Sequence, residues 1–190
     1  MIFFKGANLK YVFLTSLLFA SLFSVSCVSM PGDVRYSESK AEGTKELAVD
    51  LGWVASNGMK VGVFKNSEME KDKATLEVCL YSNTIGTEGS LLINIDGDKT
   101  IFKSFDKLSL IDKDTGNQTC FKKRYGVTLS YLQKMVAGKS VWLKANTNNG
   151  TYIEGEFSKD GLTTAKTGFI KFLSQINMAT GEILDKPAAK

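Results

Sequence analysis

The stretch VWLKANTNNGTYIEGEF, residues 141–157, predicts an antiparallel β-hairpin with one buried face. Side chains along a strand point alternately to the two faces of a sheet. One face of this hairpin collects the apolar residues Val141, Leu143, Ile153 and Phe157. We expect that face to point toward the protein core, with the polar segment NTNNG forming the turn.

Further hairpins are expected earlier in the chain. Asn57 and Gly58 separate the runs 46–55 and 59–65, and an Asn-Gly pair suits a type I′ turn because both central residues need positive φ. The Asp-Gly-Asp segment at 96–98 joins two more short apolar runs in the same way. Many short strands with regular turns are typical of a β-sandwich or a barrel.

Two segments have helical periodicity instead. Residues 128–138 begin with Thr128, a good N-cap, and end with Gly138, a good helix stop. Residues 163–177 carry a broad apolar face at helical spacing. The sequence therefore predicts a mainly β protein: a single sandwich or barrel-like antiparallel domain with two short packed helices.

The first 26 residues have the pattern of a secretory signal peptide. Lys5 and Lys10 precede the uncharged, mostly apolar run 11–23, and small residues follow it. A membrane-spanning helix needs about 20 apolar residues, so this run is short for one. We expect residues 1–26 to be a cleaved signal peptide; an uncleaved N-terminal anchor is the alternative.

The residues around Cys27 resemble the lipobox of bacterial lipoproteins. Val25 and Ser26 fit the two positions before the cysteine, whereas Ser24 stands where that pattern prefers Leu. The resemblance implies that Cys27 becomes the first mature residue, carries a diacylglycerol and anchors the protein to a membrane; Val28, in place of Asp, favours the outer membrane. Each buried acyl CH₂ contributes about 0.8 kcal/mol, so a triacylated cysteine would hold the chain firmly. Signal cleavage without lipid is the alternative.

Amino-acid composition predicts three segments in the rest of the chain. Residues 27–46 are polar and contain proline and glycine, which predicts a lipidated N-terminus followed by a flexible tether. Residues 47–184 are expected to form the β-rich globular domain, and residues 185–190 a frayed tail.

Charge and residue usage exclude several classes of function. The chain has 24 Lys+Arg and 20 Asp+Glu, and removing the two signal-peptide lysines leaves 22 against 20. A nucleic-acid-binding protein usually has a larger, clustered excess of Lys and Arg, so this small excess of positive charge does not indicate nucleic-acid binding. The chain has no histidine, the usual general base of serine and cysteine hydrolases and the commonest metal ligand. We expect no cofactor, no metal, no catalytic residues and no enzymatic activity.

Cys79 and Cys120 remain after Cys27 is assigned to lipid. Two cysteines in an exported protein most simply form one disulfide. The alternative, a reactive thiol, lacks both a CxxC motif and a histidine to lower its pKa. We expect the disulfide.

Five residues form a candidate binding patch: Trp142, Tyr152, Lys122, Lys123 and Arg124. The two aromatic residues lie on the face opposite the apolar row of the hairpin, where they form either a binding surface or, as we expect, a second buried layer under the last helix. The three cations suit an anionic lipid, lipopolysaccharide or host polyanion, although a solvated strand end is the expected reading of so short a run.

Glu154 and Glu156 share one face of a strand, roughly 7 Å apart. Paired carboxylates occur in glycosidases. Ordinary outward-facing charges are the expected explanation, and a carboxylate-based cell-wall hydrolase is the alternative.

The run LQKMVAGKSVWLKANTNNGTYIEGEFSKDGLTTAKTGFIKFL, residues 132–173, resembles the C-terminal part of the invasion-associated locus B family. The resemblance implies an exported bacterial β-sandwich linked to host contact or surface integrity, and it carries over no catalytic residue. We therefore expect a lipid-anchored protein of the outer membrane, facing the periplasm or the surface, that acts by binding or structural contact with a protein or a polyanion. An accessory subunit of an envelope secretion or transport complex is a further alternative.

Overall fold

The computed structural model describes residues 30–54, 58–81, 85–86, 90–113, 118–158 and 162–184. The predicted signal peptide, Cys27 and the predicted tail at 185–190 lie outside these residues. No helix in the described part of the chain is long and apolar enough to cross a membrane.

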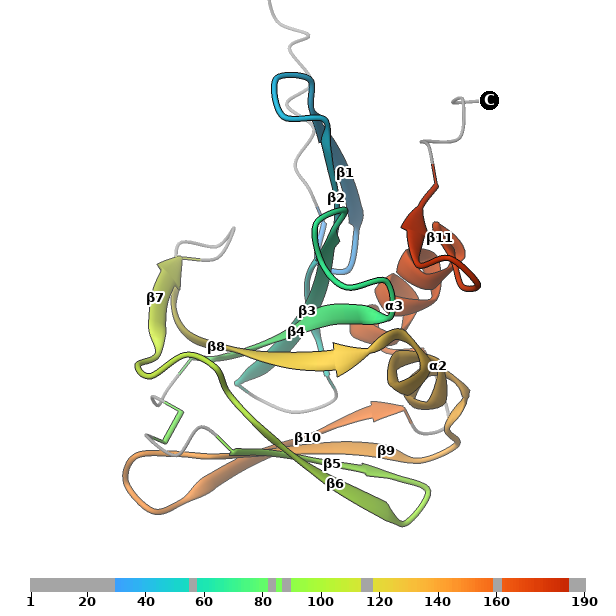
Figure 1. The fold of residues 1–190 in the computed structure, drawn as a ribbon. Coiled ribbons are helices and arrows are strands. Elements are labelled where there is room, and N and C mark those ends of the chain that lie inside the picture. The colour runs from blue at the N-terminus through green and yellow to red at the C-terminus, as the bar shows by residue number, and fades with distance from the viewer. Residues whose placement is uncertain are drawn as a thin grey trace, which may run out of the picture.

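Two antiparallel sheets form the body of the protein (Figure 1). The larger sheet has six strands, in the order β1 (Val34–Ser39), β2 (Thr44–Trp53), β3 (Met59–Asn66), β4 (Lys73–Leu80), β8 (Thr119–Thr128) and β7 (Leu110–Lys113). The smaller sheet has four, in the order β10 (Tyr152–Ser158), β9 (Val141–Asn146), β5 (Ser90–Ile95) and β6 (Asp98–Lys103). A short hairpin of β11 (Ile176–Asn177) and β12 (Glu182–Ile183) follows.

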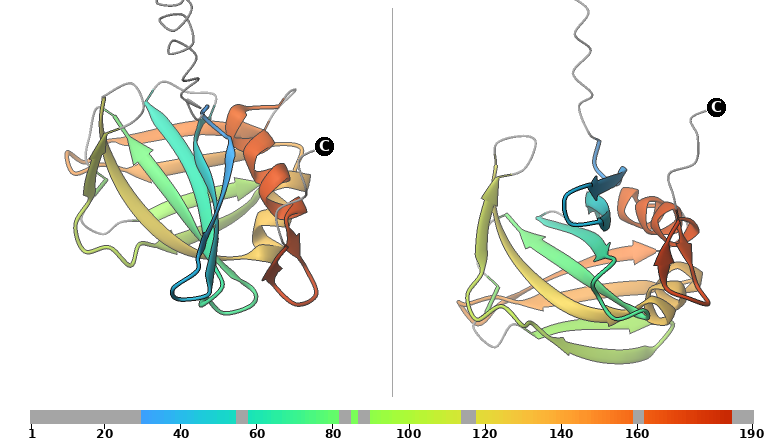
Figure 2. Two further views of the ribbon diagram at one scale, coloured as in Figure 1. Left: turned by 90° about the horizontal axis from the view of Figure 1, so that it is seen from above. Right: turned by 45° about the horizontal axis from the view of Figure 1, so that its top comes forward.

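The larger sheet is strongly curved. Its central strands β3, β4 and β8 lie across the smaller sheet, while β1 and β2 on one side and β7 on the other bend away from it (Figures 1 and 2). The outward face of this sheet is therefore concave. The predicted mainly β, sandwich-like or barrel-like fold with two helices is confirmed.

The hairpin of β9 and β10 forms as its sequence predicts. Val141, Leu143 and Phe157 are fully buried and Ile153 is half-buried, so the apolar face points into the core. The core lies between the sheets, where the inward side chains of β4 and β8 meet those of β5 and β9. The turn between β5 and β6 has the positive φ angles expected of an Asp-Gly pair, 52° at Asp96 and 102° at Gly97.

Two helices close the sandwich. α2 (Leu129–Ala137) continues directly from β8, and its N-cap Thr128 accepts a hydrogen bond from the backbone N–H of Tyr131, as predicted. α3 (Thr164–Ser174) lies against β2. The approach is close because both surfaces carry a glycine: a Cβ on Gly52 would lie 2.6 Å from the backbone nitrogen of Ala165, and one on Gly168 would lie 2.5 Å from Val49.

The predicted flexible tether over residues 27–46 is wrong for its described part. Residues 34–39 form β1, which pairs with β2 in register from Val34 and Val49 to Ser39 and Thr44. Val34 and Tyr36 are half-buried against the edge of the core, so even a largely polar segment gains apolar contacts as an edge strand. The folded domain thus begins before residue 47.

Candidate functional site

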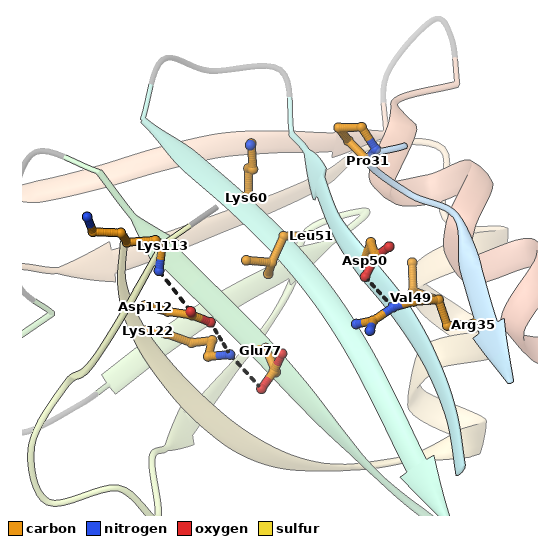
Figure 3. A pocket seen from close by; sticks show the side chains of 10 residues that line it. All are labelled: Pro31, Arg35, Val49, Asp50, Leu51, Lys60, Glu77, Asp112, Lys113 and Lys122. Atoms are coloured by element: carbon orange, nitrogen blue, oxygen red, sulfur yellow. Dashed lines mark hydrogen bonds and ion pairs between the residues drawn. The ribbon is translucent and has the colours of Figure 1, made fainter. Parts of the chain in front are cut away.

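The concave outward face of the larger sheet holds a cavity of about 270 Å³, which we call the outer groove (Figure 3). All six strands of the larger sheet and the segment before β1 contribute to it, because β1 and β2 rise on one side and β7 on the other. Its lining residues are Pro31, Arg35, Val49, Asp50, Leu51, Lys60, Glu77, Asp112, Lys113 and Lys122.

Strand register builds the floor of the outer groove. Directly paired residues in neighbouring antiparallel strands point to the same face. One such row crosses the outward face from β2 through β3, β4 and β8 to β7, and its members are Trp53, Lys60, Cys79, Lys122 and Leu110. Lys60 and Lys122 of this row line the groove. Residues far apart in the chain therefore meet on one surface.

An irregularity in β2 shapes one wall. The register with β3 shifts between Val49 and Gly52, which places Asp50 and Leu51 in the groove lining. Gly62 lies beneath them, and a Cβ there would be 2.7 Å from the carbonyl oxygen of Val49 and 3.3 Å from Cδ2 of Leu51. The bulge and the glycine together let the strand carry a carboxylate into the site.

Ion pairs line the groove. Nζ of Lys122 lies 3.1 Å from Oδ2 of Asp112 and 3.4 Å from Oε1 of Glu77. The hydrogen bond from Lys122, together with one from the backbone N–H of Lys113, lowers the pKa of Asp112 against the opposing effect of burial. On the other wall, Nε of Arg35 lies 2.6 Å from Oδ1 of Asp50.

Asp50 also leaves one acceptor open. Its second oxygen, Oδ2, is buried and has no hydrogen-bond partner among the described residues. Buried polar atoms are normally satisfied, so an unsatisfied one in a cavity wall is a place where a donor from a ligand or a water would gain a hydrogen bond.

Aromatic side chains form one end of the site. The rings of Trp53 and Tyr81 stack with centroids 5.3 Å apart. Nζ of Lys60 lies 4.4 Å from the centroid of Trp53 and 5.0 Å from that of Tyr81, within range of cation–π attraction. Trp53 is 38% exposed, so this end offers an apolar surface beside the charged floor.

The predicted disulfide joins Cys79 and Cys120. Their Cα atoms are 5.6 Å apart on the neighbouring strands β4 and β8, and both residues are buried. Cys79 belongs to the row that crosses the groove floor, so the bond links the two strands that carry Glu77 and Lys122.

The structure divides the candidate binding patch into two places. Trp142 and Tyr152 lie on the outward face of the smaller sheet, where Nζ of Lys144 is 3.5 Å from the Tyr152 ring centroid. The buried layer expected there is wrong, because Tyr152 is 53% exposed and α3 packs instead against β2. No helix covers this face in the part of the chain that the structure describes (Figure 1).

The three cations of β8 are not one cluster, because strand alternation separates them. Lys122 points into the outer groove, and Lys123 points inward and is fully buried. Arg124 points outward and pairs with Asp106 at 2.7 Å. The expected solvated strand end is wrong, since each of the three side chains has a partner.

Glu154 and Glu156 occupy outward positions on β10, opposite Lys144 and Trp142 respectively. Among the described residues, no group of three Cys, Asp or Glu side chains is placed to hold a metal ion.

Most of the outer groove was not predicted from the sequence. Its acidic and basic residues come from six strands, so no local sequence motif predicts them. A signal existed at Asp50 and Lys60, each of which is a charged residue between two apolar neighbours in its strand. Such residues are seldom buried without a partner.

Comparison with known proteins gives no relative: no protein-family model, curated protein or solved structure matches the chain.

Proposed function

We propose that this is a bacterial cell-envelope lipoprotein, anchored through Cys27, which binds a partner through the outer groove without catalysing a reaction. The observation that carries the proposal is the position of Pro31. It lines the groove and follows Cys27 by four residues, which span at most about 14 Å when extended. A lipid on Cys27 would thus hold the groove close to the headgroups of the membrane.

The charge pattern of the groove favours a protein partner. Its lining has four cations and three carboxylates, which are Arg35, Lys60, Lys113, Lys122, Asp50, Glu77 and Asp112. A polyanion would meet three like charges, whereas a protein segment supplies donors, acceptors and side chains of both signs. The stacked pair Trp53 and Tyr81 suits an apolar or aromatic anchor residue of that partner.

The disulfide supports export. Disulfides persist in oxidising compartments such as the bacterial periplasm and the cell surface. The pairing of Cys79 with Cys120 leaves Cys27 as the only other cysteine in the sequence, available for lipid.

Substituting Cys27→Ala is expected to abolish labelling by radioactive palmitate and to release the protein from the membrane fraction. Ser26→Ala is the matched control, because it keeps a small residue before the cleavage point and should retain both label and membrane association. Palmitate that persists in the Cys27→Ala protein would contradict the anchor.

The absence of catalysis is tested on peptidoglycan. We expect the purified wild-type protein to release no soluble fragments, and Glu154→Gln and Glu156→Gln to behave identically. Hydrolysis by the wild type that either substitution removes would support a carboxylate-based hydrolase instead.

A further inference from the structure

A second cavity, of about 250 Å³, lies apart from the outer groove, and we call it the end cavity. It is formed by residues 107–109, β7, β8 and the turn between β9 and β10, with Ile85, at the end of the sandwich opposite α2 (Figure 1). Ile85, Leu108, Ile111 and Phe121 give it apolar walls, and Lys123 reaches it from β8. The remaining lining residues are Lys107, Ser109 and Asn148.

Lys123 is an unusual residue for this position. Its side chain is fully buried, yet Nζ donates a single hydrogen bond, 3.1 Å long, to the carbonyl oxygen of Gly86 among the described residues. No described carboxylate lies within 4.0 Å of Nζ to form an ion pair, although an ammonium has three protons to donate. Burial lowers the pKa of Lys123, and the more distant Asp106 opposes this effect.

Lys65 shows what a buried structural lysine looks like in the same protein. Its Nζ donates to two carbonyl oxygens, those of Glu70 at 3.0 Å and Lys73 at 2.9 Å. It thereby ties the loop between β3 and β4 to β3. Nζ of Lys123 has one carbonyl partner instead of two, and it faces a cavity. A structural role therefore explains the burial of Lys123 less well than the burial of Lys65.

The mouth of the end cavity is apolar and open. Leu108 is 76% exposed and Ile111 is 73% exposed, although Ile111 pairs with Phe121 on the inward side of β7 and β8. Exposed apolar side chains at the rim of a cavity mark a place where a ligand would remove apolar area from water.

We propose that the end cavity binds a fatty-acid-type ligand, with a carboxylate at Nζ of Lys123 and a hydrocarbon chain along Phe121, Ile111 and Leu108 toward the mouth. The carboxylate supplies the missing counter-ion to a buried ammonium, and the chain covers the exposed apolar walls. Such pairing offsets the cost of burying a charge. This site does not depend on lipidation of Cys27 or on the outer groove.

The test uses [1-¹³C]decanoate and the full-length protein held in a non-ionic amphipol. We expect a bound carboxyl resonance, distinct from that of free decanoate, with the wild type. Lys123→Met should weaken binding by about tenfold or more, the value of a hydrogen bond between charged groups. Lys99→Met, at an exposed position of β6 that lines neither the end cavity nor the outer groove, should change it by less than about twofold.

A control ligand and a second variant complete the binding test. [1-¹³C]Acetate should give no bound resonance, because it has no chain for the apolar walls; binding of acetate as tight as that of decanoate would mean an anion site only. If Lys123→Met does not fold, Leu108→Glu replaces it in the test. A carboxylate at the mouth of the cavity should repel decanoate and reduce its binding by about tenfold. The proposal is overturned if the wild type gives no bound resonance, or if binding is unchanged in whichever of these two variants folds.

Discussion

Removal of the Cys79–Cys120 disulfide should lower the free energy of unfolding by about 4 kcal/mol, because the bond closes a long loop in the unfolded chain. The two cysteines are 41 positions apart. Without the bond, the unfolded state gains the conformational freedom of that loop. A typical domain is stable by only about 5–15 kcal/mol, so this loss is a large share of the total.

The measurement is urea unfolding of the Cys79→Ala/Cys120→Ala protein beside the wild type. We expect a lower midpoint together with a slightly steeper denaturant dependence, because the unfolded chain becomes more expanded. Cys27→Ala is the matched control and should leave the midpoint unchanged. A double variant that unfolds at the wild-type midpoint would contradict the stabilising role of the bond.

Asp106→Asn is expected to destabilise the fold at neutral pH by about 2 kcal/mol, the scale of hydrogen bonds to a charged group. Oδ1 of Asp106 lies 2.7 Å from Nη2 of Arg124, and Oδ2 accepts a 2.7 Å hydrogen bond from the backbone N–H of the same residue. The Asp106 side chain is only 6% exposed, so solvent replaces little of what is lost. Asp98→Asn, at the exposed first position of β6, is the control and should have little effect.

Acid unfolding gives this prediction a second readout. Burial raises the pKa of Asp106, but the side-chain and backbone hydrogen bonds from Arg124 outweigh it, so the pKa is lower than that of a free Asp. The stabilisation is therefore complete above the unfolded-state value of about 3.9 and is lost as the pH falls through the folded-state value. Wild type should lose more stability than Asp106→Asn across this interval. Equal losses in the two proteins would contradict the ion pair.

The regular elements of the fold follow from local sequence. The β9–β10 hairpin has an apolar face that only one strand register can bury. α2 begins after its N-cap Thr128 and ends before its C-cap Gly138, as the sequence of that segment alone predicts. Each of these features depends only on residues that are close together in the sequence. The edge strand β1 was missed because its polar sequence has few apolar residues, and its stability comes from pairing with β2.

The outer groove could not be predicted in the same way. Lys60, Glu77 and Lys122 share one face only because three strands pair in one register, and the sheet then curls around that face. The prediction for Lys122, Lys123 and Arg124 was wrong for a different reason. It treated the three residues as one basic cluster. Side chains alternate along a strand, so Lys123 points into the core while its two neighbours point outward.

The proposed function depends most on the processing of Cys27, and mass spectrometry of the protein isolated from its native membrane tests that processing directly. We predict that the first residue of the mature chain is Cys27, with a diacylglycerol thioether on its sulfur, and that Cys79 and Cys120 are joined in the same molecule. A chain that retains residues 1–26, or that begins with an unmodified Cys27, would contradict the proposed anchor and the membrane-proximal position of the outer groove.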